Sequence, residues 1–599
     1  MSKSWFLSSW IGAAALSTVA FALPALGASI AGDSKLAAIG QTFFNGSWEF
    51  RPADATSAGV HQIISPLPGG AHIAFNPDSQ LGSVTPAAFA SEIERLHKTL
   101  DELQALSAGD LSLDGRADRQ LLMSDIGRRL FALETRPEWR MSPNYYVDLG
   151  SSAVFSIVSR DFAPLSERML FVTVRESKIP AMLAQGEKNI VSSEVPAIYA
   201  QTAQLDALGA ADFLEHDVAS AFAPVDDNPT YKAEFVKTNA AAAAAFRSYA
   251  AFIKQTVVPD AHAPFAIGAD AYEHLEALQN VDDIPLSRLL AVGEANLSKD
   301  KAAFIATARE IDPNASPTEV ADKMKADHPT ADRLIPTAQS DLNDLVAFIK
   351  SKHILDLPDA PVARAVPTPQ FERQFTFASM DSPGPLETNA TEAYYNVTPV
   401  EPTWTSAQSD EHLGFFNRYN LLVVSAHETY PGHYTNYLFN KQTDLSLIRK
   451  LEWNVAFGEG WAHYDEQMVV DEGLGGGDPR YRLAQLSGAL QRDCRYIVGI
   501  KEHTQGMTIE QATQFLMDNG FMGREPAYRE AVRGTGDPLY GYYTLGKLML
   551  LKLRSDYQAK MGAQFDLAKF HDALLSHGDP PIYYIRRMLL GADDKGSLL

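Results

Sequence analysis

A heptapeptide in the C-terminal half constrains the fold of this 599-residue chain more than any other feature. It reads His-Glu-Thr-Tyr-Pro-Gly-His from His427 to His433 and follows the apolar run Leu421–Val424, which predicts that it lies in a hydrophobic core. Because the two histidines are six residues apart, a regular helix would place them roughly 120° apart around its axis. Pro431 removes a helical donor and Gly432 accepts unusual backbone angles. We therefore expect a distorted helix that turns both histidines toward one point.

The residue types in this heptapeptide are those of a catalytic metal site. Two neutral imidazoles, from His427 and His433, can bind a borderline-soft cation such as zinc. Glu428, next to the first histidine, can act as general base on a metal-bound water, as in HExxH metallopeptidases. The usual spacing of four residues between the histidines is six here, and the Pro-Gly pair supplies a mechanical reason for that departure.

A second motif, from Glu459 to Glu466, supplies a candidate for a third ligand. It reads Glu-Gly-Trp-Ala-His-Tyr-Asp-Glu. On a regular helix one face would carry four polar side chains, those of Glu452, Glu459, His463 and Glu466. A second face would carry the apolar side chains of Trp453, Phe457, Trp461, Tyr464 and Met468. Such a helix is either a surface helix or the wall of a cleft. Two histidines and one carboxylate, with the fourth position open to water, form a catalytic zinc arrangement.

Together the HExxPGH and EGWAxYxE motifs resemble those of the bacterial DUF885 family, whose sites are similar to those of gluzincin metallopeptidases. The family also resembles the mostly helical M3/M32-type peptidases in fold. This resemblance implies that His427, His433 and Glu459 bind zinc (Zn²⁺) and that Glu428 is the base. It is clear over residues 390–599 and rests on helical character and length over residues 40–360. The alternative is that the histidines are buried structural residues and Glu459 lies on a solvated face.

Hydrolysis of a peptide also needs a donor for the oxyanion of the tetrahedral intermediate. Five downstream side chains are candidates: His503, Arg529, Arg533, Tyr542 and Tyr543. The sequence Tyr543-x-x-Gly546 is similar to a late Y-x-x-G motif of the family, which favours Tyr543 as the donor, with His503 as a second catalytic candidate. The alternative for each tyrosine is a core aromatic residue whose hydroxyl is satisfied.

One segment departs from the family pattern R-x-x-x-D-x-G-x-H. Arg495 and His503 match it, but Gly499 replaces the acid and Lys501 replaces the glycine. The missing acid is a candidate for orienting His503, so this departure favours a protein that binds metal without catalysis. Three other side chains could orient a ligand histidine: His463, Asp465 and Glu466. A solvated helix face is the alternative for Asp465.

The first 27 residues predict export to the periplasm or secretion. One basic residue, Lys3, precedes the apolar run Trp10–Leu23, and the small residues Ala25 and Gly27 fit a signal-peptidase site. No cysteine lies near that site, which argues against a lipid anchor, and no later stretch is long and apolar enough to span a bilayer. The alternative is an uncleaved membrane anchor. The single cysteine, Cys494, excludes an internal disulfide and predicts a buried small side chain.

Helical patterns dominate the rest of the chain and predict a mainly α fold. After the signal peptide we expect a helical N-terminal region, 28–357, and a catalytic region, 358–599, that contains both motifs. Cap signals at Thr85-Pro86, Ser316-Pro317 and Thr508 mark helix starts. Short strands are expected at 371–377 and 393–397. A small sheet ahead of the metal-binding helix is similar to the zincin arrangement, in which an edge strand binds the peptide backbone.

The sequence therefore predicts an exported zinc-dependent metallohydrolase, most simply a peptidase that cleaves short peptides. The net charge of −23 argues against nucleic acid or an anionic membrane as a partner. One alternative is a helical periplasmic protein that binds metal or peptide without chemistry. Another is a zinc hydrolase of a different amide or ester. The pattern leaves the oligomeric state and the position of the cleaved bond open.

Overall fold

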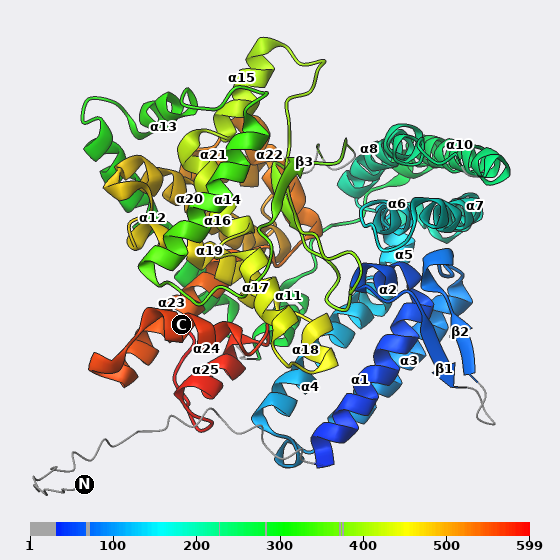
Figure 1. The fold of residues 1–599 in the computed structure, drawn as a ribbon, viewed down its shortest axis with the longest axis horizontal. Helices are drawn as coiled ribbons and strands as arrows, with labels where there is room; N and C mark the ends of the chain where they lie inside the picture. Colours follow the sequence, from blue (N-terminus) through cyan, green and yellow to red (C-terminus); the bar gives the residue numbers. More distant parts are fainter. Residues whose placement is uncertain (1–30, 67–71, 227, 282–283, 371–372, 374–375) are drawn as a thin grey trace, which may run out of the picture.

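The computed structural model describes residues 31–66, 72–226, 228–281, 284–370, 373 and 376–599. Over these residues the chain is mainly α-helical, with one two-stranded hairpin and one three-stranded sheet (Figure 1). The predicted fold class is thus confirmed. No helix in the described ranges is both long enough and apolar enough to cross a membrane. The predicted signal peptide lies outside the described residues.

The N-terminal part is built from helices that pack on one another, with the antiparallel hairpin at one edge. Its elements are α1 (Ala31–Phe50), α2 (Pro52–Ala58), β1 (Ile63–Pro66), β2 (His72–Phe75), α3 (Pro86–Gln104), α4 (Leu113–Leu130), α5 (Glu138–Met141), α6 (Asn144–Val158), α7 (Leu165–Asn189), α8 (Ala197–Phe213), α9 (Ala219–Ala221) and α10 (Pro229–Phe252). Thr85 caps α3 with its side chain, as the sequence predicted.

The C-terminal part contains the remaining helices and the three-stranded sheet. Its elements are α11 (Ala269–Asn280), α12 (Leu286–Ile311), α13 (Pro317–Lys325), α14 (Leu334–Lys352), β3 (Arg364–Pro367), β4 (Ala378–Asp381), β5 (Tyr394–Val397), α15 (Ser406–Phe415), α16 (Arg418–Glu428), α17 (His433–Gln442), α18 (Leu447–Leu451), α19 (Val455–Asp471), α20 (Pro479–Thr504), α21 (Ile509–Gly520), α22 (Arg524–Gly536), α23 (Tyr542–Met561), α24 (Leu567–Leu575) and α25 (Ile582–Leu590). Ser316 and Thr508 form the capping boxes that the sequence predicted.

Buried apolar side chains form two clusters. One contains residues from Leu36 to Val257 together with Ala390 and Ile448, and the other contains residues from Tyr272 to Leu598. The packing therefore divides before α11, whereas the sequence placed the division at 357/358, where the chain becomes extended. The physical reason is that α12 packs along α20 and α14 packs against α16, so both helices belong to the C-terminal core. Cys494 is fully buried in that core.

The three-stranded sheet has the order β3-β5-β4, with β3 parallel and β4 antiparallel to β5. In the view of Figure 1 it lies between the N-terminal helices and the helices of the C-terminal core. The strand predicted at 393–397 is present as β5. The strand predicted at 371–377 lies mostly outside the described residues. The strand β4 starts at Ala378, and its four residues pair with Tyr394–Val397. As an edge strand, β4 contacts α16 and so reaches the heptapeptide.

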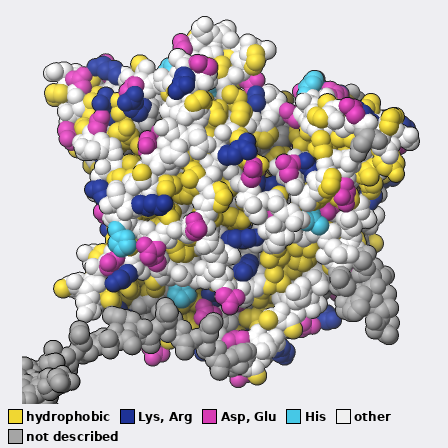
Figure 2. Space-filling view, in the orientation of Figure 1, with side chains coloured by type: hydrophobic (Ala, Val, Ile, Leu, Met, Phe, Trp, Pro, Cys, Tyr) yellow, Lys and Arg dark blue, Asp and Glu magenta, His cyan; other side chains and the backbone are white. Residues whose placement is uncertain are grey.

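Charged side chains of both signs are interspersed over the face that Figure 2 shows.

Buried ion pairs also connect the N-terminal and C-terminal parts of the chain. Arg449 of α18 is buried and pairs with Asp114 and Asp118 of α4 at 2.8 and 2.6 Å. Bidentate and charge-assisted contacts of this kind hold two surfaces in a fixed orientation. They join the N-terminal helices to the segment that leads into the second motif.

Candidate metal centre

The heptapeptide interrupts a helix. The first of its two helices, α16, ends at Glu428, and α17 begins at His433. Thr429 leaves the helical region with φ −122° and ψ −80°, and the Tyr430–Pro431 peptide bond is cis. The distortion predicted from the Pro-Gly pair is confirmed, as a complete break in the helix. The two histidines therefore lie on separate helices, with their orientations set independently.

Glycine is required at position 432 by close approach of the backbone. A Cβ atom built on Gly432 would lie 1.8 Å from the carbonyl oxygen of His427 and 2.5 Å from that of Ala426. The Gly432 N–H donates to the Ala426 carbonyl at 3.0 Å. The turn thus folds directly against the end of α16, and this contact brings His433 back toward His427. Any larger residue would push the two histidines apart.

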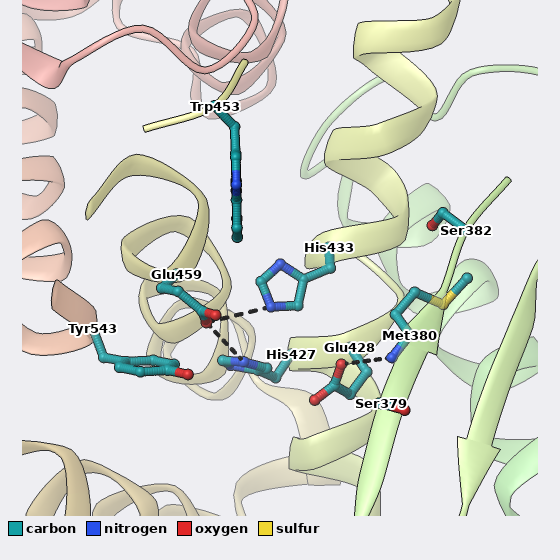
Figure 3. A pocket seen from close by; sticks show the side chains of 9 residues that line it. All are labelled: Ser379, Met380, Ser382, His427, Glu428, His433, Trp453, Glu459 and Tyr543. Atoms are coloured by element: carbon teal, nitrogen blue, oxygen red, sulfur yellow. Dashed lines mark hydrogen bonds and ion pairs between the residues drawn. The ribbon is translucent and has the colours of Figure 1, made fainter. Parts of the chain in front are cut away.

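The structure brings His427, His433 and Glu459 together. The Oε2 atom of Glu459 lies 3.7 Å from Nε2 of His427 and 3.4 Å from Nε2 of His433. One ligand atom from each of the three residues lies within 4.8 Å of the other two. The imidazole rings stand nearly perpendicular, at 87°, with centroids 4.9 Å apart. Figure 3 shows all three side chains directed at one point of the pocket.

The donor atoms fit a zinc ion. Glu459 Oε2 is buried and has no hydrogen-bond partner among the described residues, although both imidazoles face it. A buried carboxylate oxygen without a donor is costly unless a cation compensates it. Two imidazole nitrogens and one carboxylate oxygen are also the protein ligands of many catalytic zinc sites. The three residues therefore form a candidate zinc site of the open type.

Glu466 fixes which nitrogen of His427 faces this point. Its carboxylate lies 2.7 Å from Nδ1 of His427, so Nδ1 carries a proton for that bond and Nε2 is free to accept a metal ion. Arg492 binds the same carboxylate at 2.9 Å. Burial acts to raise the pKa of Glu466, but Arg492 and His463 hold the pKa well below its usual range. The predicted orienting role of Glu466 has the required geometry.

The neighbouring charges also shape the titration of His427 and Glu459. Burial and Arg492 act to lower the pKa of His427, but the nearby carboxylates of Glu459 and Glu466 outweigh them and raise it to about 9. Burial acts to raise the pKa of Glu459, while His433 and His427 hold it well below its usual range. Glu459 is therefore a charged carboxylate at neutral pH. The raised pKa of His427 means that its imidazole carries a positive charge at neutral pH, and a metal ion at Nε2 would displace one proton.

Glu428 lies at the junction between this centre and the sheet. Its Oε2 atom accepts a hydrogen bond of 3.0 Å from the backbone N–H of Met380 in β4. Because Met380 N–H points at Glu428 and not at β5, the free edge of β4 is turned toward the site. A cavity of about 340 Å³ opens here. It is lined by Ser379, Met380, Ser382, His427, Glu428, His433, Trp453, Glu459 and Tyr543 (Figure 3).

Tyr543 lines the cavity on the side away from Glu428 (Figure 3). Its ring stacks at 22° on that of His427, with centroids 6.3 Å apart. Arg533 Nη2 donates to the Tyr543 hydroxyl oxygen at 3.5 Å, so the hydroxyl proton is left to point elsewhere. Burial and Glu459 raise the pKa of Tyr543 despite Arg533 and Arg495, so the hydroxyl stays protonated at neutral pH. It can therefore act as a hydrogen-bond donor in the cavity.

Two glycines place Tyr543 beside Glu459. Helices α19 and α23 pack against each other, and they cross with the Gly460 and Gly546 backbones in contact. A Cβ atom on Gly546 would lie 1.8 Å from the carbonyl oxygen of Ala456, and a Cβ atom on Gly460 would lie 2.6 Å from Gly546 Cα. The glycines of the EGWA and Y-x-x-G motifs are therefore partners in one helix crossing.

We expect Gly546→Ala to destabilise the protein, because the atoms in the way belong to backbone that cannot move aside. Overpacking of this kind costs about 1–3 kcal/mol of unfolding free energy, or more. Chemical denaturation measures the loss. Gly536→Ala is the matched control, since a Cβ atom there meets nothing within 4 Å. Equal stability of the two variants would show that α19 and α23 do not cross as described.

His503 does not join the site, and its predicted catalytic role is corrected. It is 1% exposed, does not line the cavity, and its Nε2 bonds to the carbonyl oxygen of Gly534 at 2.8 Å. Burial lowers its pKa to about 4, so it is neutral. The nearby Gly499 packs against the carbonyl oxygen of Pro538. The segment that departs from the family pattern is therefore outside the cavity and gives no support for an inactive site.

The second motif helix starts later than the sequence pattern predicted. Asn454 caps α19, so the helix begins at Val455, and Glu452 and Trp453 precede it. Trp453 lines the cavity with its side chain 43% exposed, instead of joining a core stripe. The capping asparagine was the sequence signal for this boundary. Asp465, a candidate for a solvated face, is fully buried, and burial raises its pKa.

Other residues at the site were not found from the sequence. Arg492 lies 26 residues from Glu466, and Met380 lies 48 residues from Glu428. Only the tertiary fold brings each pair together, so no local spacing marks them. Two downstream candidates are placed apart from the cavity lining. Arg529 is exposed and pairs with Glu525 at 3.4 Å, and Tyr542 is not part of the lining.

Comparison with solved structures supports the fold independently. A "putative lipoprotein of unknown function" from Shewanella oneidensis is 24% identical, with a TM-score of 0.74 over 93% of this chain and 99% of that chain. A "putative lipoprotein" from Colwellia psychrerythraea is 16% identical, with a TM-score of 0.77 over 94% and 99%. At these identities the likeness concerns the fold. No curated protein sequence matches the chain.

Comparison with protein families extends the motif resemblance to most of the chain. Residues 52–589 match the family described as "Bacterial protein of unknown function (DUF885)". The match includes both motifs, the edge strand and the N-terminal helices from α2 onward. The chain belongs to the DUF885 family.

Proposed function

We propose that the protein is an exported zinc-dependent metallohydrolase, and that it cleaves short peptides. The observation that carries the proposal is the convergence of His427, His433 and Glu459 on one point of a cavity, with Glu428 beside them. A site that only stored metal would have no use for a carboxylate held next to the ligands but outside the ligand set. This arrangement therefore favours hydrolysis over metal binding alone.

The roles of the residues follow from their positions. A zinc ion held by the three ligands would polarise the scissile carbonyl and lower the pKa of water. Glu428 is placed to take a proton from the attacking water and to pass it to the leaving amine. The hydrogen bond from Met380 N–H holds the Glu428 carboxylate in place between these two events. Tyr543, on the other side of the histidines, would donate a hydrogen bond to the oxygen that gains negative charge.

The free edge of β4 supports a peptide as the substrate. Ser379, Met380 and Ser382 line the cavity, and within the described part of the chain β4 has no neighbouring strand on this side of the sheet. An extended peptide can add to such an edge through main-chain hydrogen bonds, with alternate side chains directed into pockets. An ester or a non-peptide amide would use the same hydrolytic groups but not the strand edge.

Export is part of the proposal. The apolar N-terminal stretch has the pattern of a signal peptide, and each of the two similar structures is described as a "putative lipoprotein". This chain carries its single cysteine at position 494, buried in the C-terminal core, so lipid attachment near the cleavage site is not part of the proposal.

The proposal is tested with purified mature protein that has been stripped of metal and then reloaded with zinc. Each form is incubated with a mixture of short synthetic peptides, and the products are identified by mass spectrometry. We expect cleavage by the zinc-loaded form and none by the stripped form. Zinc binding without cleavage of any peptide, ester or amide would favour the alternative of a non-catalytic binding protein.

We expect Tyr543→Phe to reduce kcat while zinc content stays unchanged, because the variant loses one hydrogen-bond donor to the transition state. Loss of one such donor costs about 10²–10³-fold in kcat. Steady-state kinetics and metal analysis of the same preparation measure both quantities. Tyr542→Phe is the control, since Tyr542 precedes Tyr543 but does not line the cavity. Equal kcat for both variants would exclude Tyr543 as the donor.

A further inference from the structure

Three arginines surround Tyr543. The guanidinium groups of Arg492 and Arg495 each lie 5.4 Å from the centre of its ring, and Arg533 reaches its hydroxyl. Two of these cations have close carboxylate partners. Arg492 binds Glu466 at 2.9 Å, and Arg495 forms a two-point contact with Glu530 at 2.6 and 2.7 Å. The positive charges of Arg492 and Arg495 are therefore compensated by carboxylates of the protein itself.

Arg533 differs from the other two. Its closest carboxylate is that of Asp537, at 3.9 Å, which is too long for a hydrogen bond. Its bond to the Tyr543 hydroxyl is long, at 3.5 Å. The Arg533 side chain is 45% exposed, whereas those of Arg492 and Arg495 are 15% and 10% exposed. The Arg533 guanidinium, which is exposed beside Tyr543, therefore has N–H groups that could bind a ligand.

The distance from the Tyr543 hydroxyl to Arg533 is similar to the length of one extended peptide residue. Tyr543 links His427 and Arg533: its ring stacks on that of His427, and its hydroxyl oxygen lies 3.5 Å from Nη2 of Arg533. An extended residue spans about 3.3–3.6 Å, so a group bound at Arg533 would be one or two residues from the bond under attack. A carboxylate there would be kept away from Glu428, which lies across the site (Figure 3).

We propose that Arg533 binds a carboxylate of the substrate one or two residues from the cleaved bond, and that this carboxylate is the C-terminus of a short peptide. Guanidinium groups bind carboxylates through two parallel N–H···O bonds, which fixes both distance and orientation. The enzyme would then release residues from the C-terminal end of peptides. An acidic side chain near the cleaved bond would offer the same carboxylate. Peptides that carry only one of these two carboxylates separate the two sources.

This inference rests on the proposed function and is tested first by binding. Zinc-loaded Glu428→Gln protein, which should bind substrate without turning it over, is titrated by calorimetry with a tripeptide as free acid and as C-terminal amide. We expect the free acid to bind at least tenfold more tightly. Adding Arg533→Met should abolish the difference by weakening only the acid. Arg529→Met is the control, because Arg529 is an exposed arginine of the same helix that is paired with Glu525.

A second pair of peptides separates the two sources of carboxylate. Both are C-terminal amides, one with glutamate and one with glutamine next to the cleaved bond. Equal binding of this pair supports the C-terminus as the ligand, and preference for glutamate overturns that assignment. Equal binding of the free acid and the amide by protein with Arg533 intact overturns the carboxylate site itself.

Cleavage assays on the protein with Glu428 intact distinguish failure of the inference from failure of the function. Hydrolysis of acid and amide peptides at the same rate would overturn the inference and leave the hydrolase proposal standing. Hydrolysis of neither, by zinc-loaded protein, would overturn both. The Asp537→Asn variant tests the inference through an expected gain in affinity. Removing the nearest competing carboxylate should tighten binding of the free acid and leave the amide unaffected.

Discussion

Glu428→Gln should almost abolish hydrolysis while zinc remains bound. The amide of glutamine keeps the size of the carboxylate, and its oxygen can still accept the hydrogen bond from Met380 N–H, but it cannot accept a proton from water. General acid–base groups contribute about 10²–10⁴-fold to rate, so we expect kcat to fall by that factor. Peptide hydrolysis and zinc content are measured on the same preparation.

Glu411→Gln controls for the change of charge, because Glu411 is an exposed residue of α15 outside the cavity lining. It should retain the activity of the unmodified protein. Full activity of Glu428→Gln with zinc in place would show that another group accepts the proton. Loss of zinc from this variant would instead indicate that Glu428 belongs to the ligand set.

The residues of the candidate centre were accessible from the sequence because two short motifs fix them. The helix break between Glu428 and His433 follows from Pro431 and Gly432, whose backbone requirements are local. The same holds for helix starts at Thr85, Ser316 and Thr508, where one side chain bonds to the backbone three residues later. Local chemistry of this kind can be read before the fold is known.

The positions that the sequence misjudged depend on contacts between distant segments. Helical spacing alone put Glu452 and Trp453 on the second motif helix, but the Asn454 cap ends that pattern and leaves Trp453 in the cavity wall. His503 matched a family position, yet its Nε2 atom bonds to the Gly534 carbonyl on another helix and the side chain does not line the cavity. The residue spacing in α20 does not indicate which face of this helix lies toward the histidines. The sequence therefore did not identify Arg492 as a partner of Glu466.

The glycine contacts explain how distant motifs act as one site. Glu459 precedes Gly460 in α19, and Tyr543 lies one turn before Gly546 in α23. The close crossing of these helices sets the distance between a ligand and the candidate oxyanion donor. Gly432 has the corresponding role between His427 and His433. Each motif glycine therefore sets a backbone distance on which the placement of a functional side chain depends.

His433→Ala and Glu459→Ala should each lose zinc, whereas the unmodified chain should hold about one zinc ion. Each substitution leaves two of three protein ligands, and Glu459→Ala also leaves two histidines without the carboxylate that faces both of them. Glu466→Gln should be intermediate, because residues that orient a ligand typically change metal affinity by about 10–100-fold. Metal analysis after gel filtration, together with competition against a chelator, measures this order.

The same variants should differ in how zinc affects unfolding. A ligand that binds only the folded state stabilises it by RT ln(1 + [L]/Kd), about 4 kcal/mol at a thousand times Kd. Added zinc should therefore raise the Tm of the unmodified protein and of His274→Ala, a control at an exposed histidine, but not that of His433→Ala or Glu459→Ala. An undiminished zinc-dependent rise in both ligand variants would place the ion elsewhere. That result would overturn both the assignment of the three-residue metal centre and the proposal of a hydrolase that depends on it.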